Sequence, residues 1–308
     1  MKMKNETYQN LTEDDLLICA LGYESRSWFL FEQNLATRNK ENTLVFCFEK
    51  HKQAKIILEE IDAKEINIVE GNYSDITVAE SKLKDFLKTL SPKREGLKIH
   101  FDYSSMPRSW YCSFPLMIRD SLNTEMQVFF WYVSGDYPNQ YSNYPSAGIE
   151  SISVFAGLAL PAVDIKRVHI VGLGYDNIRT ETVISIIEPE SLIACYAYNP
   201  QNSETKDSAY KANKRVVDRS LLSVALPIDN FCGTVDMLCE LTYNSMQDGQ
   251  VVIVPDGPKP LIMAMSMVPS IINKNGVTCL HISRNSNHFN KIDVKPRKNE
   301  IYGFQILF

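Results

Sequence analysis

The 308-residue sequence lacks the short motifs that mark most nucleotide, metal and nucleophile sites. No GxxxxGK[ST] run is present, which excludes a P-loop NTPase, and Gly172-Leu-Gly174-Tyr-Asp-Asn-Ile lacks the third glycine of the dinucleotide fingerprint. HExxH, GxSxG and Cys/His sets at zinc spacing are also missing. His100, His169 and His281 lie in apolar runs, where core positions are expected. We therefore predict no cofactor and no metal site.

Long apolar runs and an excess of basic residues are absent as well. The longest apolar stretch, 152–162, is too short to span a bilayer, and the N-terminus has no apolar core typical of a signal peptide. Lys and Arg total 32 against 37 acidic residues, a net charge of −5 that argues against a general nucleic-acid-binding protein. The seven cysteines form no CxxC pair and are expected to be buried, reduced thiols. We therefore expect a cytoplasmic protein without membrane contact.

Two pairs of matching segments recur at nearly the same offset. Leu21-Gly22-Tyr23-Glu24 recurs as Leu173-Gly174-Tyr175-Asp176, an offset of 152 residues (173 − 21). Met106-Pro107-Arg108 matches Gly257-Pro258-Lys259, an offset of 151 residues (257 − 106). Because both matches follow short apolar runs and occur in the same order, they indicate an internal repeat.

Apolar runs typical of buried strands alternate with stretches of helical length in both halves. The clearest of these runs are 16–20, 44–48, 168–171, 192–196 and 251–254. Such alternation is typical of parallel βαβ units, so we predict an α/β fold of two tandem Rossmann-like, parallel-sheet units, 1–160 and 161–308. The first unit is expected to end in a strand over 149–155, and the second in a strand over 301–308.

Both repeated segments lie at predicted carboxyl ends of strands, where open α/β sheets bind ligands. The helix starts that follow carry free N–H groups suited to anions, and arginine matches phosphate bidentately. We therefore predict a phosphate-bearing ligand bound by Arg26, Ser104, Ser105, Arg108, Arg179, Asp256 and Lys259. The alternative is that each basic residue pairs with an acid of its own loop, as Arg26 with Glu24.

Two further functions stay open from the residues alone, so the sequence does not decide whether the protein is an enzyme. A nucleotide or nucleoside hydrolase or glycosyl transferase would use Asp102 or Glu24 as base or nucleophile. A non-catalytic assembly subunit would dock the aromatic residues of 131–144 on a partner protein. The basic stretch 206–219 leaves contact with nucleic acid possible, although a solvated helix face is its ordinary interpretation.

The tandem arrangement resembles the CARF/SAVED group of Rossmann-like sensors in prokaryotic antiviral systems. In that family, a loop after the first strand and a later Gly-Thr-Lys-type turn before a helix cradle the phosphates of a cyclic oligonucleotide. Asp256-Gly257-Pro258-Lys259 is similar to a degenerate form of that turn, and Ser105-Met106-Pro107-Arg108 to a more divergent one. The resemblance implies a sensor or specificity subunit of a defence-type protein complex. No effector segment is visible in the sequence, so we expect a separate partner protein or a homo-oligomer.

Overall fold

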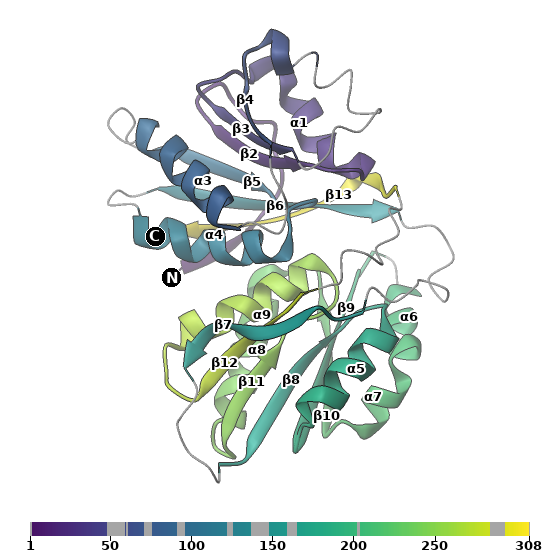
Figure 1. Cartoon of the computed structure of the whole chain (residues 1–308). Helices are drawn as coiled ribbons and strands as arrows, with labels where there is room; N and C mark the ends of the chain where they lie inside the picture. Colours follow the sequence, from purple (N-terminus) through teal and green to yellow (C-terminus); the bar gives the residue numbers. More distant parts are fainter. Residues whose placement is uncertain are drawn as a thin grey trace. The chain divides into compact units, whose positions relative to one another are not determined.

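A computed structural model describes residues 2–47, 59, 61–70, 76–90, 96–121, 126–136, 148–158, 165–201, 204–283 and 293–307. The chain forms two compact α/β units (Figure 1). Unit 1 comprises Met1–Pro138 together with Lys291–Phe308, and unit 2 comprises Asn139–Asn290. The C-terminal segment therefore belongs to the unit that the N-terminal part of the chain forms.

Unit 1 is built on a mixed sheet that has seven strands in the described part of the chain. In spatial order these are β1 (Lys2–Glu6), β13 (Lys295–Leu307), β6 (Gln127–Asp136), β5 (Lys98–Asp102), β2 (Leu16–Leu21), β3 (Thr43–Cys47) and β4 (Asn67–Glu70). The strands from β6 to β4 are parallel to one another. β13 is antiparallel to β6, and β1 is antiparallel to β13.

Helices bury both faces of this sheet. After β2 come η1 (Ser25–Trp28), α1 (Phe29–Asn34) and η2 (Leu35–Thr37), and α3 (Ile76–Leu90) and α4 (Arg108–Ser121) lie on the other face (Figure 1). Trp28 and Phe31 pack in a cluster with Leu17 and other inward residues of β2. On the α4 face, Trp110 packs edge-on against Phe46, with ring centres 5.0 Å apart. Every residue of β2 is buried, as expected for a central parallel strand.

Unit 2 contains a mixed sheet of six described strands with helices on both faces. The order is β10 (Leu222–Pro227), β9 (Ser191–Tyr198), β8 (Arg167–Leu173), β11 (Gln250–Val254), β12 (Val277–Ser283) and β7 (Ser151–Leu158). One face carries α5 (Asn177–Ile187), α6 (Glu204–Ala212) and α7 (Lys214–Arg219), and the other carries α8 (Phe231–Ser245) and α9 (Lys259–Ile272) (Figure 1). The core between the sheet and α5 is apolar, with Val183 and Ile184 packed on strand residues.

The two sheets share one strand order. From one edge, unit 1 runs β4-β3-β2-β5-β6-β13, and unit 2 runs β10-β9-β8-β11-β12-β7. In each sheet five parallel strands are followed by one antiparallel strand. The order reverses between β2 and β5 in unit 1, and between β8 and β11 in unit 2, so these are the switch points where such sheets bind ligands. The predicted α/β fold with Rossmann-like sheets is confirmed, although both sheets are mixed and not purely parallel.

The antiparallel strand that adjoins the five parallel strands of each sheet comes from an unexpected part of the chain. The run 149–155, expected to end the first unit, contributes to β7, which pairs with β12 of unit 2. The run 301–308, expected to end the second unit, contributes to β13, which pairs with β6 of unit 1. Both assignments are wrong, and the units therefore differ from a division at residue 160. Alternating polarity predicts that a strand has one buried face, but it does not specify which sheet edge the strand joins.

The cysteines are free thiols, as expected, and most of them lie in the core. Cys19, Cys47, Cys112, Cys195 and Cys279 are buried. Burial raises the pKa of the Cys195 thiol to about 12. The half-buried Cys232 and Cys239 of α8 have pKa values raised to about 11, mainly by burial. A thiol with so high a pKa is protonated near neutral pH and is a poor nucleophile.

Gly303 of β13 lies opposite Trp131 of β6, and its lack of a side chain makes space for the indole ring. A Cβ at this position would lie 2.1 Å from Trp131 Cε3. We expect Gly303→Ala to lower the free energy of unfolding by about 1–3 kcal/mol, because the buried indole must move. All three tryptophans (Trp28, Trp110 and Trp131) belong to unit 1, so urea unfolding followed by tryptophan fluorescence reports on this unit. Lys298→Ala, at an exposed position of the same strand, is the control, and an equal loss in both variants would contradict the prediction.

Candidate functional site

The loops that follow β2 and β5 meet at the switch point of unit 1. Gly22 begins the first loop, and a Cβ at this position would lie 2.7 Å from Ser105 Oγ of the second. The glycine therefore allows the two loops to approach closely. Most of the residues predicted for the site lie on these loops: Glu24, Arg26, Asp102, Ser104, Ser105 and Arg108.

Arg26 is buried in unit 1 by contacts within the protein. Its Nε donates to Glu24 Oε2 at 2.5 Å, and its Nη1 donates to the Tyr132 hydroxyl oxygen at 3.0 Å. The guanidinium carbon also lies 5.5 Å from the centre of the Tyr132 ring. Arg26 is only 2% exposed. The alternative interpretation, in which Arg26 pairs with Glu24 of its own loop, is therefore confirmed.

Asp102 and Ser104 shape the loop between β5 and α4. Asp102 Oδ1 accepts a hydrogen bond from the Ser104 amide at 2.9 Å, a local turn typical of aspartate. Ser104 Oγ in turn accepts from the Val133 amide of β6 at 2.8 Å. Both residues are buried. These bonds hold the loop against the neighbouring strand, so that the half-buried Ser105 and Arg108 lie on its outer side.

Arg108 is the first residue of α4 and is half-buried. The first turn of this helix contains no acidic residue. Because the first N–H groups of a helix have no partners within the helix, its start favours an anion. A basic side chain at that point adds a positive charge beside these donors.

In unit 2, the loops after β8 and β11 pack backbone against backbone. Gly257 has a φ of +106°, and a Cβ there would lie 2.7 Å from the Leu173 carbonyl oxygen, so only glycine fits. A Cβ on Gly174 would lie 3.1 Å from Gly257 Cα. The Gly-Pro-Lys turn is therefore held tightly on the Leu-Gly-Tyr-Asp loop, which explains why both segments contain glycine at these points.

A buried ion pair joins the same two loops. Arg179 Nη2 donates to Asp256 Oδ1, and the two residues are 1% and 3% exposed. Asp176 caps α5, because its Oδ1 accepts from the Arg179 amide at 3.0 Å. Lys259, the first residue of α9, is half-buried, and the helix has no side-chain cap at its start. Lys259 is thus the basic residue of this edge that retains exposed surface.

The predicted site residues therefore fall into two groups. Five of them are buried and build the loops: Arg26, Asp102, Ser104, Arg179 and Asp256. Four of them are half-buried and remain accessible at the loop surfaces: Glu24, Ser105, Arg108 and Lys259. The structure brings the unit 1 residues together at one switch point and the unit 2 residues together at the other.

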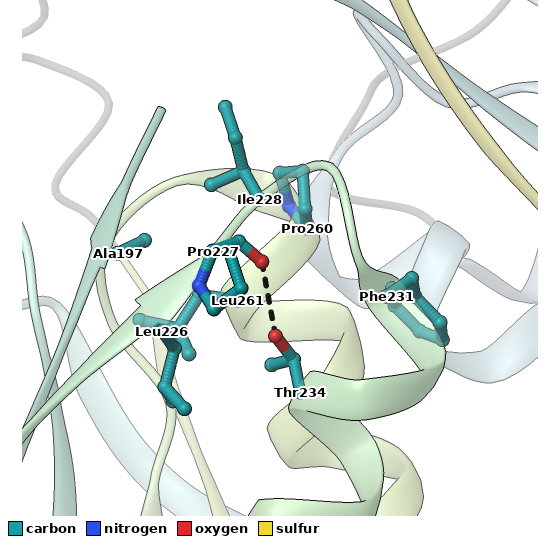
Figure 2. A pocket seen from close by; sticks show the side chains of 8 residues that line it. All are labelled: Ala197, Leu226, Pro227, Ile228, Phe231, Thr234, Pro260 and Leu261. Atoms are coloured by element: carbon teal, nitrogen blue, oxygen red, sulfur yellow. Dashed lines mark hydrogen bonds between the residues drawn. The ribbon is translucent and has the colours of Figure 1, made fainter. Parts of the chain in front are cut away.

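A small apolar hollow adjoins the start of α9 in unit 2 (Figure 2). Pro260 and Leu261, which follow Lys259, form one wall, and Phe231 and Thr234 of α8 form another. The remaining lining residues come from the carboxyl ends of β9 and β10: Ala197, Leu226, Pro227 and Ile228. Thr234 Oγ1 donates to the Pro227 carbonyl oxygen at 3.0 Å, so the hydroxyl of this residue is already bonded within the wall and the hollow offers a mainly apolar surface.

Two side chains that the sequence did not associate with the site contact its first loop. Tyr132, expected on an aromatic docking loop, lies buried in β6 and accepts from Arg26. Asp293, which is not part of any sequence motif, accepts hydrogen bonds from the amide and the hydroxyl of Ser25. Only the pairing of β13 with β6 brings Asp293 to this loop, so no local signal in the sequence predicts it.

The other polar segments have contacts typical of ordinary surface and core. Trp131 is buried in β6 together with Tyr132, and Tyr137, Tyr141 and Tyr144 lie outside the described residues. In the basic stretch, exposed Lys214 pairs with Asp218 at 2.7 Å, and exposed Arg215 with Glu181 at 3.7 Å. The side chain of Lys206 also lies outside the described residues. The described part of this stretch is a solvated helix face.

His100 and His169 lie in the core, as expected, and His281 is half-buried in β12. The Trp131 indole Nε1 donates to His100 Nδ1 at 2.9 Å, and the imidazole stacks on Phe129 with ring centres 4.6 Å apart. Burial lowers the pKa of His100 to about 4, although Asp15, 4.0 Å from its Nε2, acts in the opposite direction. His100 is therefore neutral at physiological pH and belongs to the core of unit 1.

This pKa predicts how stability depends on pH. Well above pH 6.5, the ordinary pKa of histidine, His100 is neutral in both folded and unfolded states. As the pH falls toward 4, the unfolded chain binds a proton that the folded chain does not, so the free energy of unfolding decreases. At pH 4.5 the loss from this residue is about 2 kcal/mol. Urea unfolding at pH 7 and pH 4.5 should show a smaller pH dependence in His100→Gln than in the wild type, and an unchanged difference would contradict this.

The Arg179–Asp256 pair predicts a large effect of a single substitution. Asp256→Ala removes the nearer of two carboxylates from a buried guanidinium, leaving Asp176 Oδ2 at 3.9 Å from the Arg179 Nε, and should lower the free energy of unfolding by about 3–5 kcal/mol. Asp248→Ala, at an exposed acid of the same unit, should change it by less than about 0.5 kcal/mol. Urea unfolding followed by circular dichroism measures both. Adding Arg179→Met to Asp256→Ala should recover part of the loss, because the unpaired charge is then removed.

Comparisons of the sequence with known proteins do not assign it to a family. The sequence matches no protein-family model and has no significant match among curated proteins. Within the described ranges, no helix is long and apolar enough to cross a membrane. Among the same residues, no group of three or more His, Cys, Asp or Glu side chains is placed to bind a metal ion.

Proposed function

We propose that the protein binds a phosphate-bearing ligand, a nucleotide, a cyclic oligonucleotide or a nucleic-acid end, at the carboxyl edges of its sheets. The observation that carries the proposal is one arrangement found in both units. In each sheet, the strand after the switch point leads through a short Pro-containing loop into a helix whose first residue is basic, Arg108 in α4 and Lys259 in α9. Helix N–H groups and a positive side chain together suit phosphate oxygens.

The surroundings of these two residues support a binding role. Ser105, three residues before Arg108 in unit 1, is half-buried. In unit 2 the two residues that follow Lys259, Pro260 and Leu261, line a small apolar hollow (Figure 2). Arg26, Arg179 and Asp256, which form buried pairs, would support the loops and not contact the ligand directly.

The shared strand order and the matching segments support descent of both units from one duplicated α/β unit. Together with the resemblance to CARF/SAVED sensors, this favours a sensor or specificity subunit that recognises a cyclic oligonucleotide within a defence-type assembly. The contacts of the two candidate catalytic acids favour binding over catalysis. Glu24 is paired with Arg26, and Asp102 is buried and accepts from the Ser104 amide.

Calorimetric titration tests the proposal with a panel of nucleoside mono- and triphosphates and cyclic di-, tri- and tetranucleotides. We expect the wild type to bind at least one of them, and Arg108→Ala or Lys259→Ala to weaken binding about 10- to 100-fold through loss of a charge-assisted hydrogen bond. Lys40→Ala and Lys214→Ala remove exposed lysines that already pair with acids, and they should leave affinity unchanged.

The pattern of effects also locates the site. Weakening by Arg108→Ala alone would place the ligand on unit 1, and weakening by Lys259→Ala alone would place it on unit 2. Affinity should fall as salt increases, because phosphate contacts are screened. Absence of binding across the panel, or binding that neither substitution weakens, would refute the proposal.

A further inference from the structure

The first turn after β2 receives its capping carboxylate from the far end of the chain. The Ser25 amide donates to Asp293 Oδ1 at 2.7 Å, and the Ser25 hydroxyl lies 2.7 and 2.8 Å from the two carboxylate oxygens. The next amide, that of Arg26, donates to the Val294 carbonyl oxygen at 3.1 Å. Two consecutive amides of the site loop are therefore bonded to residues 268 positions later in the sequence.

The matching loop of unit 2 shows why this distant contact is needed. There Asp176 caps α5 with its own side chain, which accepts from the Arg179 amide. The corresponding residue of unit 1 is Glu24, at the N-cap position of η1, and it makes no capping hydrogen bond. Glutamate is longer than aspartate and is a poor N-cap, and Glu24 instead reaches Arg26. Asp293 brings a carboxylate to the start of η1, where it accepts from the first amide of the turn and not from the third, as Asp176 does in α5.

The same C-terminal segment fixes the other side of the loop. Tyr302 of β13 pairs with Tyr132 of β6, whose hydroxyl accepts from Arg26. Val294, immediately before β13, is 1% exposed, and its carbonyl oxygen accepts the hydrogen bond from the Arg26 amide. The main chain of Arg26 and the partner of its side chain are thus both attached to the strand that returns from the end of the sequence.

We propose that Asp293 is a positioning residue, which sets the conformation of the Gly22–Arg26 loop through Ser25 and thereby the affinity of the unit 1 site. The inference rests on the proposed function for its ligand, but its structural part does not depend on any ligand. The Asp293 side chain is exposed, so its substitution removes the hydrogen bonds without creating a cavity in the core.

Hydrogen–deuterium exchange followed by mass spectrometry tests the structural part on the full chain. Asp293→Ala should make the peptide that contains Ser25 and Arg26 exchange about tenfold faster than in the wild type, because a charge-assisted bond to its amide is lost. Asp293→Asn keeps one acceptor oxygen and should give a smaller increase. Asp62→Asn, at an exposed acid elsewhere in unit 1, is the matched control and should exchange like the wild type.

Titration of each variant with the panel member that the wild type binds tests the functional part. Faster exchange together with at least threefold weaker binding in Asp293→Ala supports the proposal. Unchanged exchange overturns it, and so does faster exchange with wild-type affinity. Tryptophan fluorescence unfolding confirms that each variant is folded. If the wild type binds no member of the panel, the proposed function fails, while faster exchange still supports the positioning of the loop by Asp293.

Discussion

Backbone hydrogen bonds between β13 and β6 connect residues 127–136 with 295–307 and determine much of unit 1. β1 pairs with β13, so the N-terminal strand also depends on this contact. Trp131 packs against the space left by Gly303, and Tyr132 and Val294 then reach the loop after β2. β7 occupies the corresponding position in unit 2. In sequence, β7 follows the strands β1–β6 of unit 1, and β13 follows the strands of unit 2, so each of these two strands joins the sheet of the other unit. Unit 1 is therefore formed from two separate segments of the chain, whereas unit 2 is one continuous segment that begins before β7.

The switch points show how buried polar groups support a surface site. In unit 1 Arg26 is held by Glu24 and Tyr132, and in unit 2 Arg179 is held by Asp256. A buried arginine must find such partners, because an unpaired charge in the interior costs several kcal/mol. These pairs keep the loops in place while Arg108 and Lys259 remain half-exposed at the helix starts. The most buried arginines of the two edges therefore stabilise the loops, and the less buried basic residues are the better candidates for ligand contacts.

The helix starts that follow β2 in unit 1 and β8 in unit 2 receive carboxylates from different parts of the chain. Aspartate in the repeated segment of unit 2 caps its own helix, whereas glutamate in unit 1 does not, and a carboxylate from the C-terminal segment replaces it. The two carboxylates bind different amides, because Asp176 accepts from the third residue of α5 and Asp293 accepts from the first residue of η1. The loop of unit 1 is thus bonded to a segment far along the chain, whereas α5 is capped from its own loop.

The sequence by itself determined the α/β class, the buried central strands and the loops at the switch points, because apolar runs, glycines and helix starts are local signals. It also predicted that Arg108 and Lys259 lie near the starts of equivalent helices, and the structure places each as the first residue of its helix. Only the tertiary structure decided which sheet β7 and β13 join, since backbone pairing is not encoded by side-chain alternation. It also decided that Arg26, Asp102 and Ser104 are buried and that Asp293 caps the first turn. Burial and long-range hydrogen bonds depend on contacts between distant residues, which no local pattern specifies.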